Sequence, residues 1–508
     1  MSLPTKPLLK FEDVKAYFSN LTTPIYFLGA TNFNLLNLEN WVKNWTSINL
    51  IDCFDGLNSS IILPINRGST VFESSQAINA FLLNHPDVAA LIKKNALMGN
   101  LQSDQAQGQA VFLFFNDEIE KACIALNLKL ALPSFSTVTE VDSKIITTQI
   151  ANEAGVASVP NTLAKVSSYD ELTAISDYYG LGEHLVVQTP YGDSGKTTFF
   201  ISNCEDYDRV AEKIEAEKKV KIMRRIRCAS AAIEGCTTRC GTFVGPLLTE
   251  LIGFSELTPY QGGWCGNELY QAAFSDSIRQ QAQEMTEQLG DILYQRDYRG
   301  YFEVDYLLDL DSGELYLGEI NPRITGISAM TNLCDFSYKT LPLFLWHLLE
   351  FSEVNFAIDP SEYNQLALEK GAKTIASQLI FKYREQGLQV ITQAPISGVY
   401  QFDEGTKKLV LKKASYQRRE ALAPNEVFLM RIMNEQEYIY PGADMAIVFT
   451  NTILKTPAEK LTPSALLLVN AVHATFSFRD LTTEEINLVN RYNPASSIKM
   501  TSMNETIN

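Results

Sequence analysis

The strongest constraint on the fold of this chain comes from two short stretches in which apolar and polar residues alternate. They read YFEVDYLL (301–308) and LYLGEIN (315–321), and the turn-forming segment DLDSGE separates them. Alternation with a period of two is the pattern of a β-strand whose two faces differ. The segment therefore predicts a β-hairpin. Glu303 and Asp305 share one face of its first strand, and Glu319 and Asn321 share one face of its second.

This hairpin brings carboxylates together. With the turn centred near residue 312, Asp305 lies opposite Glu319 or its neighbour, at a Cβ separation of about 4.5–5.5 Å. Carboxylates this close repel, and one takes up a proton unless a cation lies between them. With the amide oxygen of Asn321 they match the oxygen ligands that Mg²⁺ prefers. We interpret the hairpin as a metal site; the alternative is an acidic pair facing water.

The next charged residue, Arg323 in EINPR, strengthens this interpretation. An arginine beside metal-binding carboxylates suits an anion that develops on a phosphoryl or acyl-phosphate group.

A second informative segment, QTPYGDSGKTTFFIS (188–202), is rich in glycine and looks at first like a phosphate-binding P-loop. A P-loop requires glycine where this chain has Pro190, and it continues into a helix, whereas TTFFIS is typical of a strand. The segment therefore predicts a second hairpin. Its tip is either an ordinary turn or, through its N–H donors and lysine, an anion-binding turn.

The remaining segments define the surroundings of these two hairpins. Strand-like and helix-like pieces alternate before residue 135, which predicts an open parallel α/β sheet. Helices are predicted over 139–156, with Thr139 as N-cap and Gly155 as stop, and over 277–297. Strand-rich sequence from about residue 370 predicts a separate C-terminal α+β domain. The predicted N-terminal elements are strands at 24–30, 47–54 and 110–116 and a helix at 117–128.

Composition and charge argue against several classes of function. The net charge of −17 opposes a general nucleic-acid or anionic-membrane surface. One basic cluster, KKVKIMRRIR (218–227), either faces an anionic ligand or forms a solvated strand edge. The eight cysteines lack a Cys-x-x-Cys pair, the start lacks a signal-peptide core, and the four histidines suggest no triad. We therefore expect a cytoplasmic protein with reduced thiols.

Three motifs in order resemble the ATP-grasp superfamily: DSK…AGV (142–156), LVVQTPYGDSGKTTFFI (185–201) and GYFEVDYLLD…YLGEINPR (300–323). The resemblance covers roughly residues 20–350, and residues 370–480 resemble the C-terminal domain of biotin-carboxylase-type members. It implies a multidomain α/β and α+β fold with a parallel N-terminal sheet, central ATP-grasp domains with a β-hairpin lid, and a C-terminal α+β domain. The implied divisions are 1–135, 136–228 (lid), 229–365 (metal and substrate), 366–493 and a disordered tail, 494–508.

The resemblance also implies roles for individual residues. Asp305, Glu319 and Asn321 would ligate Mg²⁺, with Mn²⁺ as an alternative. Arg323 and Lys196 would act on the transferred phosphoryl group, and the 191–197 segment would close over the phosphates as a lid. The implied nucleotide-binding residues are Lys144, Gln188, Tyr191, Gly192, Ser194, Gly195, Lys196, Thr197, Arg225 and Ile226.

The implied function is an ATP-dependent ligase that joins a small-molecule carboxylate, from an amino acid or peptide, to an amine through an acyl phosphate. We expect no nucleic-acid or membrane partner, and a homodimer is common in the resembled family. Alternatives are a biotin-carboxylase-like or ribonucleotide-synthesis ligase, and a regulatory ATP-binding protein that has lost turnover.

Two positions depart from the family pattern. Gln188 stands where a second phosphate-binding lysine is usual, so Lys196 or Arg225 would have to compensate. The strand that leads to the adenine hinge lacks its usual acid, and the next acid is Glu234. The segment 253–271, with Tyr260 and Trp264, either lines an amino-acid pocket or is an ordered loop.

Overall fold

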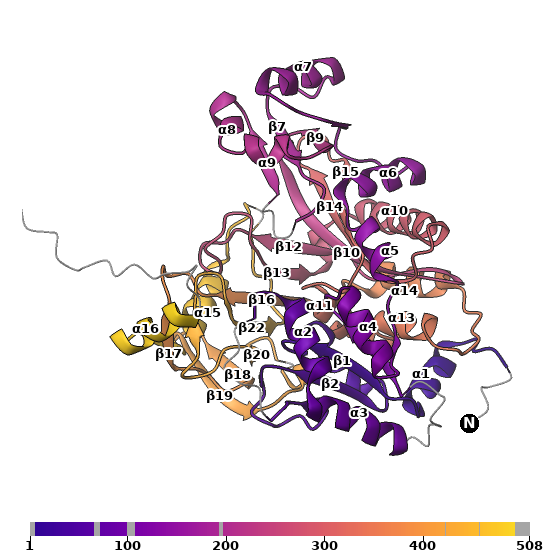
Figure 1. Ribbon diagram of the computed structural model, residues 1–508, viewed down its shortest axis with the longest axis vertical. Coiled ribbons are helices and arrows are strands. Elements are labelled where there is room, and N and C mark those ends of the chain that lie inside the picture. Colours follow the sequence, from indigo (N-terminus) through magenta and orange to yellow (C-terminus); the bar gives the residue numbers. More distant parts are fainter. Residues whose placement is uncertain are drawn as a thin grey trace, which may run out of the picture.

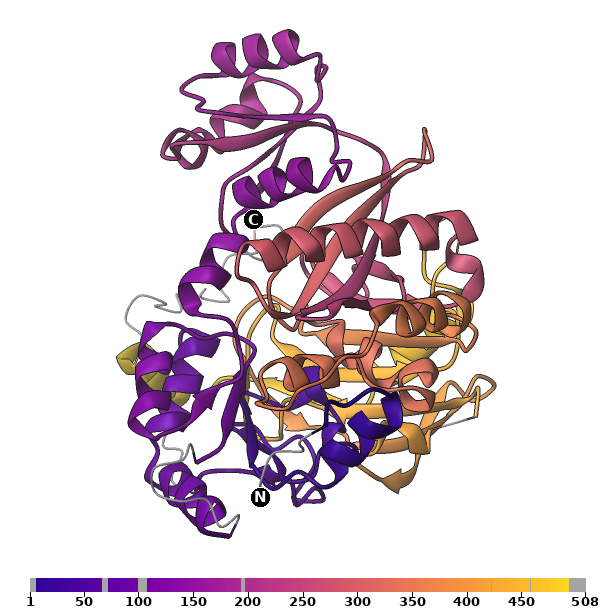
Figure 2. The same cartoon turned by 90° about the vertical axis from the view of Figure 1, so that its right-hand side faces the viewer.

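The structure is a computed structural model that describes residues 6–65, 72–98, 107–192, 197–421, 423–456 and 458–492. Four β-sheets organise these residues. Figure 1 shows the N-terminal part and the C-terminal part side by side, with a small unit (α7–α9 and β7) projecting from the rest; Figure 2 shows the same projection from the side.

The N-terminal part is a five-stranded sheet in the order β3-β2-β1-β4-β5, and every pairing is parallel. All five residues of β1 are buried, because each face of the sheet packs against its own apolar cluster. The predicted parallel α/β sheet is confirmed. Its elements are α1 (Phe11–Ser19), β1 (Ile25–Gly29), β2 (Trp45–Asn49), β3 (Ile61–Ile62), α2 (Ser75–Asn84), α3 (Pro86–Met98), β4 (Gln109–Phe112), α4 (Asp117–Ala125) and β5 (Lys129–Leu130).

Two short helices, α5 (Phe135–Val141) and α6 (Lys144–Ala154), lead out of this sheet. The prediction of one helix over 139–156 with Thr139 as N-cap was wrong, since Thr139 lies inside α5. The chain leaves the helix because Ser143 is extended and the Lys144 amide donates to the Pro190 carbonyl at 2.9 Å. Gly155 ends α6 in the left-handed conformation, as predicted.

The projecting unit contains a four-stranded antiparallel sheet in the order β6-β9-β7-β8. The hairpin predicted at 188–202 is confirmed as β7 and β8, and residues 193–196 of its tip lie outside the described residues. The elements are β6 (Asn161–Ala164), α7 (Tyr169–Tyr179), β7 (Leu185–Gln188), β8 (Thr198–Ile201), α8 (Cys204–Asp208), α9 (Ala211–Glu215) and β9 (Val220–Arg224).

An 11-stranded sheet forms the centre of the molecule, in the order β15-β14-β10-β12-β13-β16-β22-β20-β18-β19, with β11 paired to β10. The predicted amphipathic helix is confirmed as α10 (Asp276–Gln295), which packs on one face of β10 and β14 in an apolar cluster. The strands are β10 (Cys228–Thr238), β11 (Gly241–Val244), β12 (Leu248–Ile252), β13 (Trp264–Leu269), β14 (Gly300–Asp309), β15 (Leu315–Asn321), β16 (Ala376–Lys382), β18 (Gly398–Asp403), β19 (Lys408–Ala414), β20 (Glu426–Arg431) and β22 (Asp444–Thr450).

This sheet continues through the boundary expected at residue 365, because β13 pairs with β16. Gly266 is essential to that pairing, since a Cβ on it would lie 2.1 Å from the Gln378 carbonyl oxygen. The domain limits themselves stay predictions.

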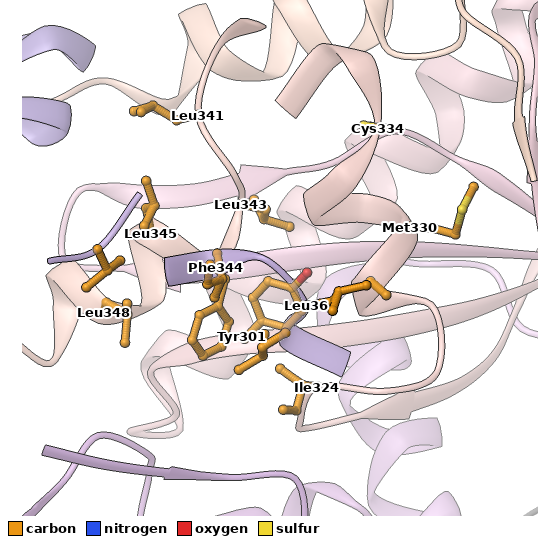
Figure 3. Close-up of a cluster of buried hydrophobic side chains, with 14 of the residues drawn as sticks. Leu36, Tyr301, Ile324, Met330, Cys334, Leu341, Leu343, Phe344, Leu345 and Leu348 are labelled. Carbon is orange, nitrogen blue, oxygen red and sulfur yellow. The ribbon is translucent and has the colours of Figure 1, made fainter. Parts of the chain in front are cut away.

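The remaining elements cover this sheet and complete the C-terminal part. Figure 3 shows part of the largest apolar cluster, where Leu36 of the N-terminal part, Tyr301 of β14 and Phe344 of α13 are drawn together. Within the described residues, no helix combines the length and apolar character needed to cross a bilayer. The elements are α11 (Ser328–Leu333), α12 (Asp335–Lys339), α13 (Phe344–Glu350), α14 (Pro360–Lys370), β17 (Gln389–Gln393), β21 (Tyr438–Ile439), α15 (Pro463–His473), β23 (Ser477–Asp480) and α16 (Thr483–Tyr492).

Candidate active site

The hairpin of β14 and β15 has the predicted register. Asp305 pairs with Glu319, and Glu303 pairs with Asn321. The Asn321 side-chain amide donates to Asp305 Oδ2 at 3.3 Å. The three side chains predicted to bind a metal are therefore neighbours on one face, opposite the face that packs on α10.

The electrostatics of this face fit a divalent cation. Burial, followed by the charges of Glu303 and Glu319, raises the pKa of Asp305 well above its usual range. Carboxylate oxygens of Glu250, Glu303 and Asp305 lie within 4.8 Å of one another. Burial likewise raises the pKa of Glu250 and of Glu303. These oxygen donors repel one another without a cation, which is the condition that Mg²⁺ binding relieves.

Lys144 connects this hairpin to the projecting unit. Its Nζ lies 2.7 Å from Glu319 Oε2 and donates to the Gly192 carbonyl at 3.2 Å, and its side chain is 9% exposed. Because Lys144 is the first residue of α6, the break between α5 and α6 sets this position. The structure thus places Lys144 between a predicted metal ligand and the base of the predicted lid.

Arg323 follows β15 and reaches toward the N-terminal part. Its Nη1 lies 2.5 Å from Asp142 Oδ1, and its guanidinium stacks over the Phe114 ring at 5.1 Å. Asp142 is adjacent to the break that positions Lys144. Lys144 and Arg323 are therefore both held by carboxylates of this region.

The described part of the predicted lid ends at Gly192 and resumes at Thr197. Tyr191 is half exposed, whereas Gly192 has φ +149 and a Cβ on it would lie 2.2 Å from the Thr197 side chain. Only glycine fits this close approach. Ser194, Gly195 and Lys196 lie outside the described residues.

The expected adenine hinge follows β9. Arg225 is exposed and stacks over the Phe200 ring at 5.1 Å. Ile226 packs against a small apolar cluster of the two sheets, which provides a surface that a purine ring could use. The cluster consists of Val159, Val186 and Met223, with Ile226, Leu307 and Tyr316 packed against it.

Glu234, the next acid after the hinge, does not lie there. It is fully buried in β10, where it accepts from the hydroxyls of Tyr301 and Ser328 at 2.5 Å. Burial raises its pKa to about 7. Glu234 is therefore part of the internal hydrogen bonding beneath the site.

The loop at 253–271 divides into two parts. The ring of Trp264 lies against Gly326, where a Cβ would come within 2.3 Å of it, and its indole donates to Asn267 at 3.0 Å. Tyr260 instead donates to the Pro441 carbonyl in the C-terminal part. Trp264 thus borders the segment that follows Arg323, and Tyr260 does not.

Sequence reasoning missed Lys221. It belongs to the basic cluster 218–227, whose other lysines and arginines are exposed, but Lys221 itself is 1% exposed. Burial lowers its pKa to about 8. The available signal was its place in the strand, between the buried residues Val220 and Ile222.

The molecule combines a parallel N-terminal sheet, a four-stranded unit whose hairpin lies over an acidic hairpin, and a C-terminal part joined to the same central sheet. Together these parts define the ATP-grasp fold in its biotin-carboxylase-like arrangement. Solved structures share this fold. The biotin carboxylase domain of Hydrogenobacter thermophilus 2-oxoglutarate carboxylase, in complex with MgADP, ADP and bicarbonate, has a TM-score of 0.59 at 10% identity, over 93% of this chain and 94% of that chain.

Two further structures agree. Campylobacter jejuni biotin carboxylase, in complex with a β,γ-ATP ligand, has a TM-score of 0.56 at 11% identity, over 90% of this chain and 92% of that chain. The N5-carboxyaminoimidazole synthase of Aspergillus clavatus, in complex with ADP and 5-aminoimidazole ribonucleotide, has a TM-score of 0.52 at 12% identity, over 89% and 99%. No protein-family model and no curated protein matches the sequence.

Proposed function

We propose that this protein is an ATP-dependent ligase that joins a carboxylate to an amine through an acyl phosphate. The observation that carries the proposal is the acidic face of β14 and β15, where Asp305, Glu319 and Asn321 meet Lys144 at the base of a glycine hairpin. Support also comes from the fold, because two of the solved structures named above hold ADP, one of them as MgADP with bicarbonate, and the third is a complex with a β,γ-ATP ligand.

The proposed reaction has two steps. A carboxylate oxygen attacks the γ-phosphorus of ATP, the bond to the β-phosphate oxygen breaks, and ADP leaves. The amine nitrogen then attacks the acyl carbon, the bond to the phosphate oxygen breaks, and the amine loses a proton. No side-chain nucleophile is required, so the residues of the chain act by binding, orienting and excluding water.

The chain supplies specific groups for this reaction. Asp305, Glu319 and Asn321 would hold Mg²⁺, or alternatively Mn²⁺, which when bound neutralises phosphate charge. Lys144 and Arg323 are placed to face anionic oxygens, once released from Glu319 and Asp142. The lid segment, with Lys196 as a further phosphate contact, would exclude water.

The acidic face also supports a second substrate that carries an ammonium group. Glu250 and Glu303 extend it beyond the proposed metal ligands. Burial favours the protonated form of these carboxyl groups unless a cationic partner is bound, and a substrate ammonium group is such a partner. An amino acid or peptide meets this requirement, and Trp264 would border its pocket.

The decisive experiment measures ADP release with MgATP across pools of amino acids and small carboxylic acids. We expect release that depends on an acid and an amine together. ADP release that depends on bicarbonate instead would favour the second candidate, a biotin-carboxylase-like or ribonucleotide-synthesis ligase, which the bicarbonate-bound structural neighbour supports.

A third candidate is a regulatory nucleotide binder, which Gln188 supports because it removes a charge from the lid strand. Calorimetric binding of MgATP without ADP release under any of these conditions would establish it and would exclude the ligase. As part of the ligase proposal we retain a cytoplasmic location and a homodimer.

A further inference from the structure

Lys221 occupies an unusual position for a lysine. It lies within β9, an inner strand of the four-stranded sheet, with β6 on one side and β7 on the other. Its side chain is 1% exposed. A lysine is rarely buried to this extent unless an anionic partner is available.

The two faces of this sheet have different surroundings, and Lys221 lies on the one that faces the acidic hairpin. The opposite face packs through Val187, Val220 and Ile222 against the unit's own helices. Lys221 shares its face with Met223, which packs toward Leu307. Its Nζ is 3.4 Å from the carbonyl oxygen of Gly318, the residue before Glu319.

Within the described residues Lys221 forms no ion pair. The neighbouring carboxylate, Glu319, is already 2.7 Å from the Lys144 ammonium group. A carbonyl oxygen at 3.4 Å is a weak substitute for an anion. The ammonium group of Lys221 therefore has charge that no side chain of the described ranges neutralises directly.

Gln188 lies directly across from Lys221 in the β7–β9 pairing, so both side chains leave the sheet on the same face. The Gln188 amide donates to the Thr198 hydroxyl at 3.1 Å, and its carbonyl oxygen is buried without a hydrogen-bond partner among the described residues. Adjacent strands are about 4.8 Å apart, which a lysine can span with its four-carbon stem. A cation on β9 can thus reach the space next to a short neutral side chain on β7.

We propose that Lys221 binds the phosphates of the nucleotide and supplies, from β9, the positive charge that Gln188 does not supply from β7. This inference rests on the proposed function, since it requires a nucleotide beneath the lid. It replaces the earlier expectation that Lys196 or Arg225 compensates for Gln188.

The first test compares wild-type protein with Lys221→Met by calorimetry, using MgATP and adenosine as probes. Methionine keeps the length of the side chain and removes the charge, so the fold should tolerate it. We expect the Kd for MgATP to rise about ten- to a hundredfold, as for the loss of a charge-assisted hydrogen bond. The Kd for adenosine, which has no phosphate, should stay within twofold.

The second test exchanges the two side chains in Gln188→Lys/Lys221→Gln. The variant keeps one positive charge in the same space but attaches it to β7 and not to β9. If only the position of this charge matters, MgATP affinity should recover to within about fivefold of wild type. Lys219→Met is the matched control, because Lys219 lies two residues away and is exposed. It should leave both affinities unchanged.

Equal MgATP affinity in wild type and Lys221→Met would overturn the inference and leave the ligase proposal intact. An equal loss for MgATP and adenosine would also overturn it, since Lys221 would then be only structural. If the wild-type protein neither binds MgATP nor releases ADP, the proposed function itself fails, and the inference fails with it.

Discussion

Two β-hairpins face the same region of this molecule and differ in almost every physical respect. The hairpin of β14 and β15 lies within an 11-stranded sheet, packs one face on α10 and carries its carboxylates on the other. The hairpin of β7 and β8 belongs to a projecting four-stranded sheet and carries glycine, amide and hydroxyl groups. The first forms a fixed anionic surface, and the second, in its described residues, forms an uncharged cover with Lys221 and Lys144 at its base.

This difference explains how a site for a metal and a polyphosphate can be preformed in the ligand-free protein. Carboxylates anchored in a large sheet cannot move apart to relieve their repulsion, so they remain ready to receive a cation. A hairpin in a small sheet with few partners adapts at low cost to a ligand. The predictions below test this division, from the largest expected effect to the smallest.

The largest effect should follow from changing the anionic surface itself. We expect Asp305→Asn and Glu319→Gln each to lower the rate of ADP release about a thousandfold, because each removes charge at the proposed metal site. Asp305→Asn should also raise the melting temperature of the ligand-free protein, since it removes buried repulsion.

Asp311→Asn is the matched control on the same hairpin, because its carboxylate pairs with Arg227 on the surface. Full turnover in either Asp305→Asn or Glu319→Gln would contradict the metal assignment.

The next effect concerns the connection between the two hairpins. Lys144→Met removes a group that contacts both Glu319 and the Gly192 carbonyl, and we expect turnover to fall about a hundredfold. Lys165→Met, which removes an exposed lysine that donates to the main-chain carbonyls of Glu215 and Glu217, should keep normal turnover. Normal steady-state kinetics in Lys144→Met would show that the two hairpins act independently.

A smaller effect separates the structural acid Glu234 from the acids of the site. Because burial raises its folded pKa to about 7, folded protein holds a proton that unfolded protein releases above its ordinary pKa of 4.5. This contribution to stability is complete at low pH and is lost as pH rises through about 7, for a total of roughly 3 kcal/mol at most.

The free energy of unfolding of Glu234→Gln, relative to that of wild type, should therefore increase as the pH rises from 5 to 8. Urea unfolding at each pH measures this difference. A constant difference across this range would show that Glu234 is ionised throughout.

The smallest effect is expected at the rim of the lid. Arg225→Ala removes an exposed guanidinium that stacks on Phe200, an interaction worth about 0.5–1 kcal/mol. We expect the Kd for MgATP to change less than about threefold. A tenfold loss in calorimetry would mean that Arg225 contacts the phosphates and that the cover carries more charge than Lys221 and Lys144 supply.

Much of this architecture was predictable from local patterns. The period-two alternation at 301–321 determined the hairpin and its register, because one face had to be buried. Pro190 and the strand TTFFIS excluded a P-loop and predicted the β7–β8 hairpin. The parallel N-terminal sheet followed from its alternating strands and helices.

Other features depend on contacts that are distant in sequence. The break before Lys144 arises from its backbone bond to Pro190, which no helix-end pattern in 139–156 reveals. Lys221 is one basic residue among several, and its burial depends on the pairing of β9 with β6 and β7. The link of β13 to β16 joins strands more than a hundred residues apart in the chain, so composition could not reveal it.

The pairing of β13 with β16 has a consequence for any attempt to isolate the nucleotide-binding half. A chain that stopped at residue 365 would expose the outer edge of β13, with its unused amide and carbonyl groups and the narrow Gly266 surface. Such an open edge recruits strands from other molecules. The residues after 365 therefore cover the edge of β13 and protect it from such contacts.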